Sequence, residues 1–175
     1  MEFEVLELLK NRRSIRKFKD EKVGKEVINQ VLKAGLLGPT SKNKKPVEFI
    51  VVEDKETILK LGQCKSKGVE GLVNSTCAIV IIADSEKSDV WIEDASIASI
   101  LMQLTIENLG LGSVWIQIRN RQSNNDNSEN EVRKVLNIPE KYGVLSILAM
   151  GYKNEIKEPY DDQTLDFSKV HYESF

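Results

Sequence analysis

The run Cys77-Ala-Ile-Val-Ile-Ile-Ala83 lies near the middle of this 175-residue sequence and determines its fold class. It is apolar without a break, which is the pattern of a strand buried on both faces, whereas a half-exposed strand alternates apolar and polar residues. Helices are therefore expected on both faces of the sheet that contains it. The run is also far shorter than the roughly 18 residues that cross a membrane, so we expect no membrane-spanning segment.

The segments on either side of this run predict further strands and helices in alternation. Apolar and β-branched runs predict strands at 47–53, 112–118 and 144–152. Apolar residues at helical spacing predict helices at 2–12, 25–37, 55–63, 90–109 and 129–137. At about 150 residues per domain, we expect one domain over residues 1–175. Its element order indicates an α+β or three-layer α/β/α fold that ends in an extended tail.

The predicted helix at 90–109 carries four small residues close together, at Ala95, Ser96, Ala98 and Ser99. Small side chains let a second helix approach closely, and we expect the patch to serve such a contact. Gly110 follows the helix and is expected to be its C′ residue, because glycine adopts the left-handed conformation there without steric cost.

The composition excludes several kinds of site. The chain has 1 His and 2 Cys, too few for a Cys/His zinc site or a disulfide framework, so we expect no metal. His171 lies near the C-terminus, which disfavours nucleophile–histidine catalysis. The N-terminal residues lack the basic and then apolar pattern of a secretion signal. Because the two thiols are also expected to stay reduced, we predict a cytoplasmic protein.

The formal net charge of −2 hides an uneven distribution. Residues 1–45 contain 12 Lys and Arg against 6 Asp and Glu, whereas the rest of the chain is acidic. A basic first quarter is one feature of proteins that bind nucleic acid or another polyanion. However, Phe18 is the only aromatic residue between positions 10 and 45. Platforms on which bases could stack are therefore missing, and we expect no nucleic-acid partner.

Two segments of this basic quarter are candidate anion sites. Arg12-Arg-Ser-Ile-Arg-Lys-Phe18 offers three guanidiniums and a hydroxyl, a donor set that suits phosphate. A solvated helix end is the alternative, since cations also favour the negative end of a helix dipole. Gly38-Pro-Thr-Ser-Lys-Asn-Lys-Lys-Pro46 is rich in donors and bracketed by prolines. It could bind an anion or the edge of a heterocycle, or it could simply connect a helix to a strand.

Together with further motifs, these segments resemble the nitroreductase family, and they occur in the family's order along nearly the whole chain. The matching stretches are Arg12–Phe18, Pro39–Val47, Glu93–Ala98, Gly110–Gln117, Ile138–Tyr152 and His171–Phe175.

The resemblance implies a nitroreductase-like three-layer α/β/α fold, of the α+β class, with a central mixed, mainly antiparallel sheet. It also implies an FMN cofactor. The residues that match those holding the FMN phosphate and ribityl chain are Arg12, Arg13, Ser14 and Arg16. The residues that match a strand end whose backbone N–H groups face the flavin N5 edge are Gln117 and Ile118.

The family resemblance further implies a homodimer with FMN at the subunit interface. The helix at 90–109 would form the dimer contact through its patch of small residues, and the tail from Lys153 would wrap the other subunit. The loop residues expected to reach the partner's flavin are Thr40, Ser41 and Asn43, with Lys45 where the family usually has Gln. Many members carry a basic pair in the tail, but Asp161 and Asp162 stand here. The phosphate is therefore expected to rest on the N-terminal arginines alone.

The function implied by the resemblance is that of an FMN-dependent oxidoreductase. It would pass reducing equivalents from NAD(P)H to an electron-poor acceptor, of the nitroaromatic or quinone class, by a ping-pong mechanism. The flavin would carry the chemistry, so no catalytic side chain is expected. The alternative is a non-catalytic flavin-binding or sensing protein on the same scaffold.

Overall fold

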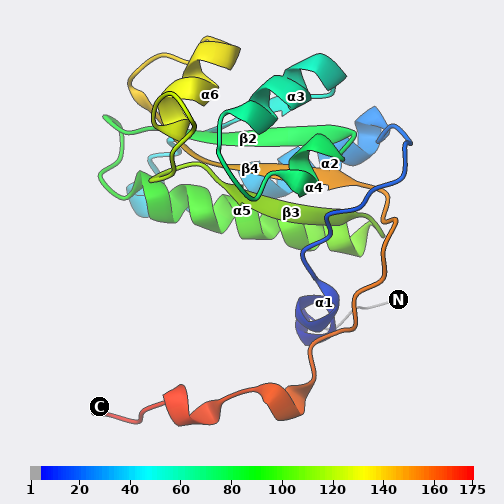
Figure 1. Cartoon of the computed structure of the whole chain (residues 1–175). Helices are drawn as coiled ribbons and strands as arrows, with labels where there is room; N and C mark the ends of the chain where they lie inside the picture. Colours follow the sequence, from blue (N-terminus) through cyan, green and yellow to red (C-terminus); the bar gives the residue numbers. More distant parts are fainter. Residues whose placement is uncertain (1–4) are drawn as a thin grey trace.

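A four-stranded antiparallel sheet forms the centre of the protein in the computed structural model, which describes residues 5–175 (Figure 1). Its strands are β1 (Val47–Val52), β2 (Cys77–Asp84), β3 (Gly112–Gln117) and β4 (Tyr142–Gly151). They lie in the order β1-β2-β4-β3, so β3 is an edge strand. A single parallel bridge, between Ser14 and Ser113, is added to the outer edge of β3.

Helices cover both faces of this sheet, as the apolar run at 77–83 predicts. The helices on one face are α3 (Lys55–Gln63), α4 (Glu70–Val73) and α6 (Ser128–Leu136), and those on the other are α2 (Lys25–Leu36) and α5 (Trp91–Asn108). Figure 1 shows α3 and α6 above the sheet and α5 below it. The expected α/β/α layers are therefore confirmed. The first helix, α1, spans Val5–Asn11; its expected start at residue 2 lies outside the described residues.

Strand β2 supplies side chains to two separate cores. Val80 and Ile82 pack with α3 and α6, whereas Ile79 and Ile81 pack with α2 and α5. All four are at most 4% exposed. A pleated strand sends successive side chains to opposite faces, so only an unbroken apolar run can fill both cores.

Three of the four small residues of α5 pack inside the chain and Ser96 is half-buried, which corrects the expected role of the patch in a dimer contact. Ala95, Ala98 and Ser99 are at most 2% exposed. Ala98 lies against Gly38, at the end of α2. The close helix partner is thus α2 of the same chain, and the apolar residues that α5 leaves exposed are Ile97 and Ile100.

Gly110 ends α5 in the left-handed conformation, with φ +79°, as expected for a C′ residue. Its backbone N–H donates to Glu107 O at 2.9 Å, and the Leu111 N–H donates to Ile106 O at 3.0 Å. These two bonds satisfy carbonyls that the helix end would otherwise leave open. The turn also directs the chain straight into β3.

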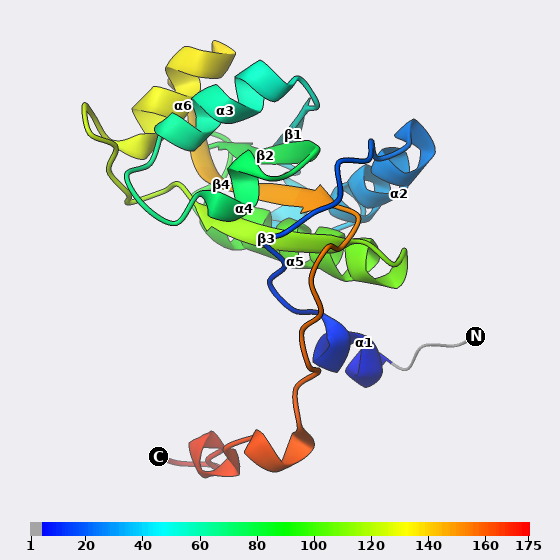
Figure 2. The same cartoon turned by 45° about the vertical axis from the view of Figure 1, so that its right-hand side comes forward.

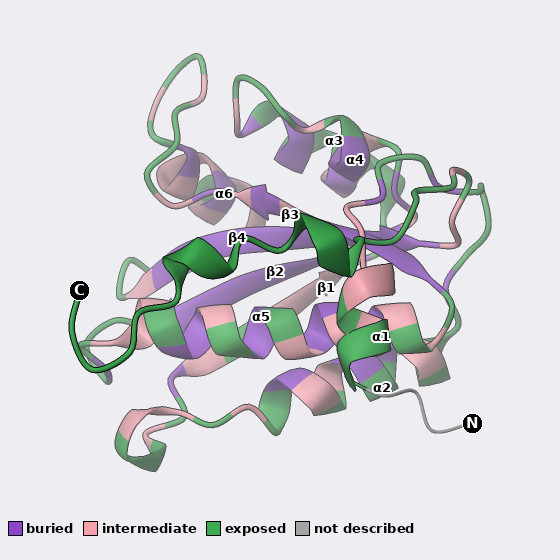
Figure 3. Ribbon diagram, turned by 90° about the horizontal axis from the view of Figure 1, so that it is seen from below, coloured by how far each residue is buried: buried purple, intermediate pink, exposed green. Residues whose placement is uncertain are grey.

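Helix α1 and the tail extend away from the sheet and its helices (Figures 1 and 2). Every tail residue from 156 onward is exposed, including the short helical turns Asp162–Thr164 and Phe167–Lys169 (Figure 3). The exposed side chains here include large apolar ones, at Leu6, Leu165, Phe167 and Phe175. Among the helices of residues 5–175, none is both long and apolar enough to cross a bilayer.

Candidate functional site

The arginine-rich segment 12–18 lies on the outer edge of β3. The Ile15 N–H donates to Ser113 O at 3.0 Å, next to the Ser14–Ser113 bridge. The Ile15 side chain is 2% exposed and rests on Gly112, where a Cβ atom would come within 2.8 Å of it. The apolar residue in the middle of the segment therefore fixes the segment against the sheet, while its polar neighbours stay at the surface.

The three guanidiniums of this segment have different environments. Arg13 turns toward the tail, where it donates to Glu158 O and lies over the Tyr160 ring, 4.4 Å from the centroid. Arg12 and Arg16 form no ion pair with any carboxylate of residues 5–175. Together with the half-buried Ser14 they are a donor set that fits a phosphate.

Glu155 binds the backbone near the C-terminal end of the arginine segment. Its Oε1 accepts the backbone N–H of Arg16 at 2.5 Å and that of Lys17 at 3.2 Å. These bonds, the one from Arg16 first, hold the pKa of the Glu155 carboxyl below its ordinary value. The Asn154 N–H donates to Lys17 O at 2.9 Å, so the start of the tail is joined to the segment by both backbone and side chain.

The loop at 39–46 is tightly wound and lies between α2 and β1. Lys42, Asn43 and Lys45 have φ of 50°, 53° and 48°, values that non-glycine residues rarely adopt. The Thr40 hydroxyl accepts the Lys45 N–H at 3.0 Å. The Ser41 N–H donates to Asp94 Oδ1 at 2.8 Å. The loop is thereby fixed to the first turn of α5, and the side chains of Lys42, Asn43 and Lys45 point to the surface.

The loop and the arginine segment lie toward opposite ends of α5. The loop touches Asp94 in the first turn, whereas the arginine segment pairs with Ser113, just after the helix has ended. At 1.5 Å per residue the 18 residues of α5 span about 27 Å. One chain therefore does not bring the two sets of predicted residues together at one point.

Hydrogen bonds from its own side chains stabilise the end of β3. The Trp115 Nε1–H donates to Gln117 Oε1 at 2.8 Å, and Gln117 Nε2 donates to Arg119 O at 2.8 Å. The Ile118 N–H is bonded to Leu145 O at 3.2 Å, and its side chain is fully buried in the core under α3 and α6. Of the two backbone N–H groups expected to face the flavin, that of Ile118 is therefore already bonded within the sheet.

The outer edge of β3 leaves backbone groups open beyond the arginine segment. Backbone groups alternate in direction along an antiparallel strand. Since Ser113 O points outward to Ile15, the N–H groups of Trp115 and Gln117 point outward too. Within residues 5–175, no segment pairs with them. The edge thus offers cationic donors at one end and backbone donors further along. That arrangement fits the phosphate and the ring of FMN.

Two loops beside the sheet add further positive charge. The Ser66 N–H donates to Gln122 O at 3.1 Å, which joins the loop after α3 to the loop after β3. The pKa of Lys65 is lowered, first by burial and then by the nearby Arg121. Lys67 is exposed on the same loop.

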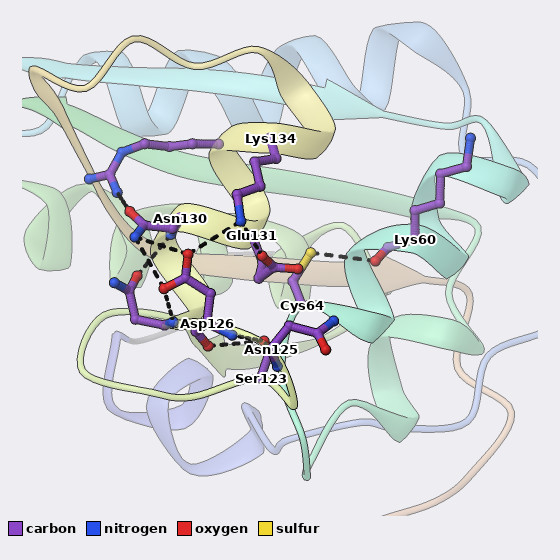
Figure 4. Close-up of polar contacts among 10 residues, drawn as sticks. Lys60, Cys64, Ser123, Asn125, Asp126, Asn130, Glu131 and Lys134 are labelled. Carbon is purple, nitrogen blue, oxygen red and sulfur yellow. Dashed lines mark hydrogen bonds and ion pairs between the residues drawn. The ribbon is translucent and has the colours of Figure 1, made fainter.

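The loop at 120–130 forms a compact surface structure. Asp126 accepts hydrogen bonds from Asn130 Nδ2 and forms an ion pair with Lys134 at 3.2 Å (Figure 4). The Ser123 hydroxyl accepts the Asp126 N–H at 3.0 Å and donates to Asp126 O at 2.9 Å. The side chain of Asn127 caps α6 by accepting the Asn130 N–H. These contacts tie the loop to α6.

The fold is that of a three-layer α+β protein, and arginines and open backbone donors lie along one edge of its sheet. The model of the nitroreductase family matches residues 9–73 and 65–152. The chain belongs to the nitroreductase family.

Individual relatives agree with this assignment. The structure of an FMN-dependent nitroreductase from Clostridium difficile R20291 is 52% identical, with a TM-score of 0.93 over 96% of this chain and 98% of that one. A nitroreductase family protein from C. difficile 630 is 30% identical, with a TM-score of 0.81 over the full length of both chains. An Archaeoglobus fulgidus protein provisionally named NADH dehydrogenase/NAD(P)H nitroreductase is 34% identical over 98% of this chain and 99% of its own.

Sequence reasoning missed the roles of Asp94 and Glu155. Asp94 lies within a recognised motif, but its bond to Ser41 joins residues 53 positions apart. Glu155 and Arg16 are 139 positions apart. A helix start rich in acidic residues was the available signal for Asp94. For Glu155 we find no signal in the sequence.

Proposed function

We propose that this protein is an FMN-dependent oxidoreductase that passes reducing equivalents from NAD(P)H to an electron-poor acceptor, of the nitroaromatic or quinone class, by a ping-pong mechanism. The observation that carries the proposal is the outer edge of β3. There the guanidiniums of Arg12 and Arg16, which form no ion pair within residues 5–175, are followed by open backbone donors. Membership of the nitroreductase family supports it, as does the similar C. difficile protein named as FMN-dependent.

The residues of the chain bind and orient the cofactor. Arg12, Ser14 and Arg16 bind the phosphate. Arg13 adds positive charge near the phosphate and also anchors the tail. The outward backbone N–H groups near Gln117 hold the polar edge of the ring. FMN, when bound, supplies the redox chemistry. No side chain of this chain is assigned as a general acid, in keeping with the division of labour in cofactor enzymes.

The active form is proposed to be a homodimer with FMN at the subunit interface. Thr40, Ser41, Asn43 and Lys45 lie toward the other end of α5 from their own chain's arginine segment. In a dimer they can approach the cofactor of the partner. The exposed apolar residues of α5, α1 and the tail supply surface for such a contact. The cytoplasmic location and the single-domain organisation remain predictions.

Colour is the first test. The purified protein is expected to be yellow, to release FMN on denaturation, and to bleach without oxygen when NADH or NADPH is added. A protein that binds FMN and does not bleach would instead be a flavin-binding or sensing protein. A colourless protein that fails to take up added FMN would contradict both functions.

A further inference from the structure

Asp94 is a buried carboxylate that contacts the surface loop at 39–46. It is 3% exposed, and it forms no ion pair with any Lys or Arg of residues 5–175. Oδ1 accepts the Ser41 N–H at 2.8 Å, and Oδ2 accepts the hydroxyl of the fully buried Ser88 at 3.1 Å. Burial of a charge is costly. Here the two hydrogen bonds and the positive end of the α5 dipole offset the cost.

The loop needs stabilising contacts from the rest of the protein because its backbone is strained. Three of its non-glycine residues lie in the left-handed region, at Lys42, Asn43 and Lys45. Such conformations persist only where the surroundings impose them, and they are common at ligand-binding sites. The other side-chain contacts from the body of the protein are exposed: Lys87 Nζ to Lys45 O at 3.2 Å, and Lys44 to Asp89 at 3.5 Å. Asp94 is the contact that is shielded from water.

We propose that Asp94 is a positioning residue for the cofactor site. Its carboxylate fixes Ser41 and so presents Thr40, Ser41 and Asn43 to the FMN of the partner subunit. Because Asp94 binds the backbone N–H of Ser41, the serine hydroxyl stays available to a ligand. The inference rests on the proposed function, in which this loop serves the partner's cofactor.

Trypsin digestion of the flavin-free protein tests, independently of FMN, whether Asp94 keeps the loop in its observed conformation. Lys42 and Lys44 are cleavage sites within the loop, whereas the bond between Lys45 and Pro46 resists trypsin. Asp94→Ala is expected to speed cleavage at these sites about tenfold, the effect of one lost hydrogen bond to a charged group. Asp94→Asn keeps an acceptor for the Ser41 N–H and is expected to stay close to the wild type.

The matched control is Glu93→Gln, since Glu93 is an exposed acid in the same helical turn. It should change neither the cleavage rate nor FMN binding. If Asp94→Ala fails to fold, Asp94→Ser takes its place. The serine side chain is too short to reach the Ser41 N–H, and its hydroxyl can hydrogen-bond to water instead. Unchanged cleavage in a folded variant that lacks the acceptor overturns the proposal.

The dissociation constant of FMN tests the positioning role. Asp94→Ala is expected to weaken FMN binding about tenfold, and Asp94→Asn should restore most of it. Faster cleavage with unchanged FMN affinity would overturn the proposal and leave Asp94 as a support for the loop alone. A wild-type protein that binds no FMN contradicts the proposed function, a result distinct from any effect of Asp94.

Mixed dimers test which cofactor the loop serves. A dimer of one Asp94→Ala chain and one Arg16→Ala chain should contain one wild-type-like site. That site would combine the intact arginines of the first chain with the intact loop of the second. Half of the sites should therefore bind FMN with wild-type affinity. If both sites are weak, the loop acts on its own chain's cofactor and the proposal is wrong.

Discussion

The guanidinium of Arg13 lies over the ring of Tyr160, 4.4 Å from its centroid, and joins the arginine segment to the tail. The same side chain donates to Glu158 O. Arg13 thus turns to the tail, whereas the guanidiniums of Arg12 and Arg16 form no ion pair with any carboxylate of residues 5–175. The sequence places all three arginines in one motif, and the structure separates their roles.

Removing the ring of Tyr160 should loosen the tail. Tyr160→Ala loses an exposed cation–π contact of about 0.5–1 kcal/mol, so trypsin should cleave after Lys157 a few times faster. Tyr160→Phe keeps the ring and should behave as the wild type. Tyr172→Ala is a control, because Tyr172 is 86% exposed. Equal cleavage of Tyr160→Ala and wild type would contradict the prediction.

The arginine segment should control flavin occupancy. Ser14→Ala combined with Arg16→Ala removes a hydroxyl and a charged donor, which together are worth about 2–4 kcal/mol. The dissociation constant of FMN should rise about 30-fold or more, with little change in the melting temperature. Lys19→Ala removes an exposed charge from the same stretch and should have little effect. Unchanged occupancy in the double variant would place the phosphate elsewhere.

Glu155 should make the stability depend on pH. Backbone hydrogen bonds lower the pKa of its carboxyl in the folded state. The stabilisation is therefore complete above the unfolded pKa of about 4.3 and disappears as the pH falls through the lower folded pKa. Glu155→Gln should cost about 1 kcal/mol at pH 7 and nothing at low pH, as measured by urea unfolding. Glu158→Gln is the control; a pH-independent difference would contradict the assignment.

The end of β3 should depend on the side-chain amide of Gln117. Gln117→Leu leaves the Trp115 Nε1–H and the Arg119 C=O without partners, at a cost of about 1–3 kcal/mol. Urea unfolding gives the loss, and the fluorescence of Trp115 should change in the folded state. Gln122→Leu alters an exposed side chain and serves as the control. Wild-type stability in Gln117→Leu would show that water replaces the amide.

Local patterns in the sequence predict the fold well. The helix expected at 90–109 is observed at Trp91–Asn108, and its glycine stop is confirmed at Gly110. Periodicity and caps are properties of neighbouring residues, so a sequence displays them directly. The short helix α4, Glu70–Val73, was not predicted, because four residues do not establish a period. Burial of Leu72 holds it in place.

The candidate site was predictable in its residue types and less so in its contacts. The arginine segment was chosen from its donors, but its place on the sheet edge depends on Ile15 pairing with Ser113. The small residues of α5 suggest a contact with a second subunit, although Ala95, Ala98 and Ser99 are buried within the chain and Ala98 lies against Gly38. A patch of small residues predicts close packing and does not identify the partner.

The exposed face of α5 should control both assembly and flavin binding. Ile97 and Ile100 are each 38% exposed on the helix. A lysine in place of either would be buried in the proposed dimer interface, where its charge would lack a partner. Ile97→Lys with Ile100→Lys should convert a dimer into a monomer, as measured by light scattering after gel filtration. FMN affinity should fall with it, because each site is proposed to need both chains. Leu59→Lys is the matched control, since Leu59 is 44% exposed on α3, across the sheet. A wild-type monomer, or a monomeric variant that keeps full FMN affinity, would contradict a cofactor shared between subunits.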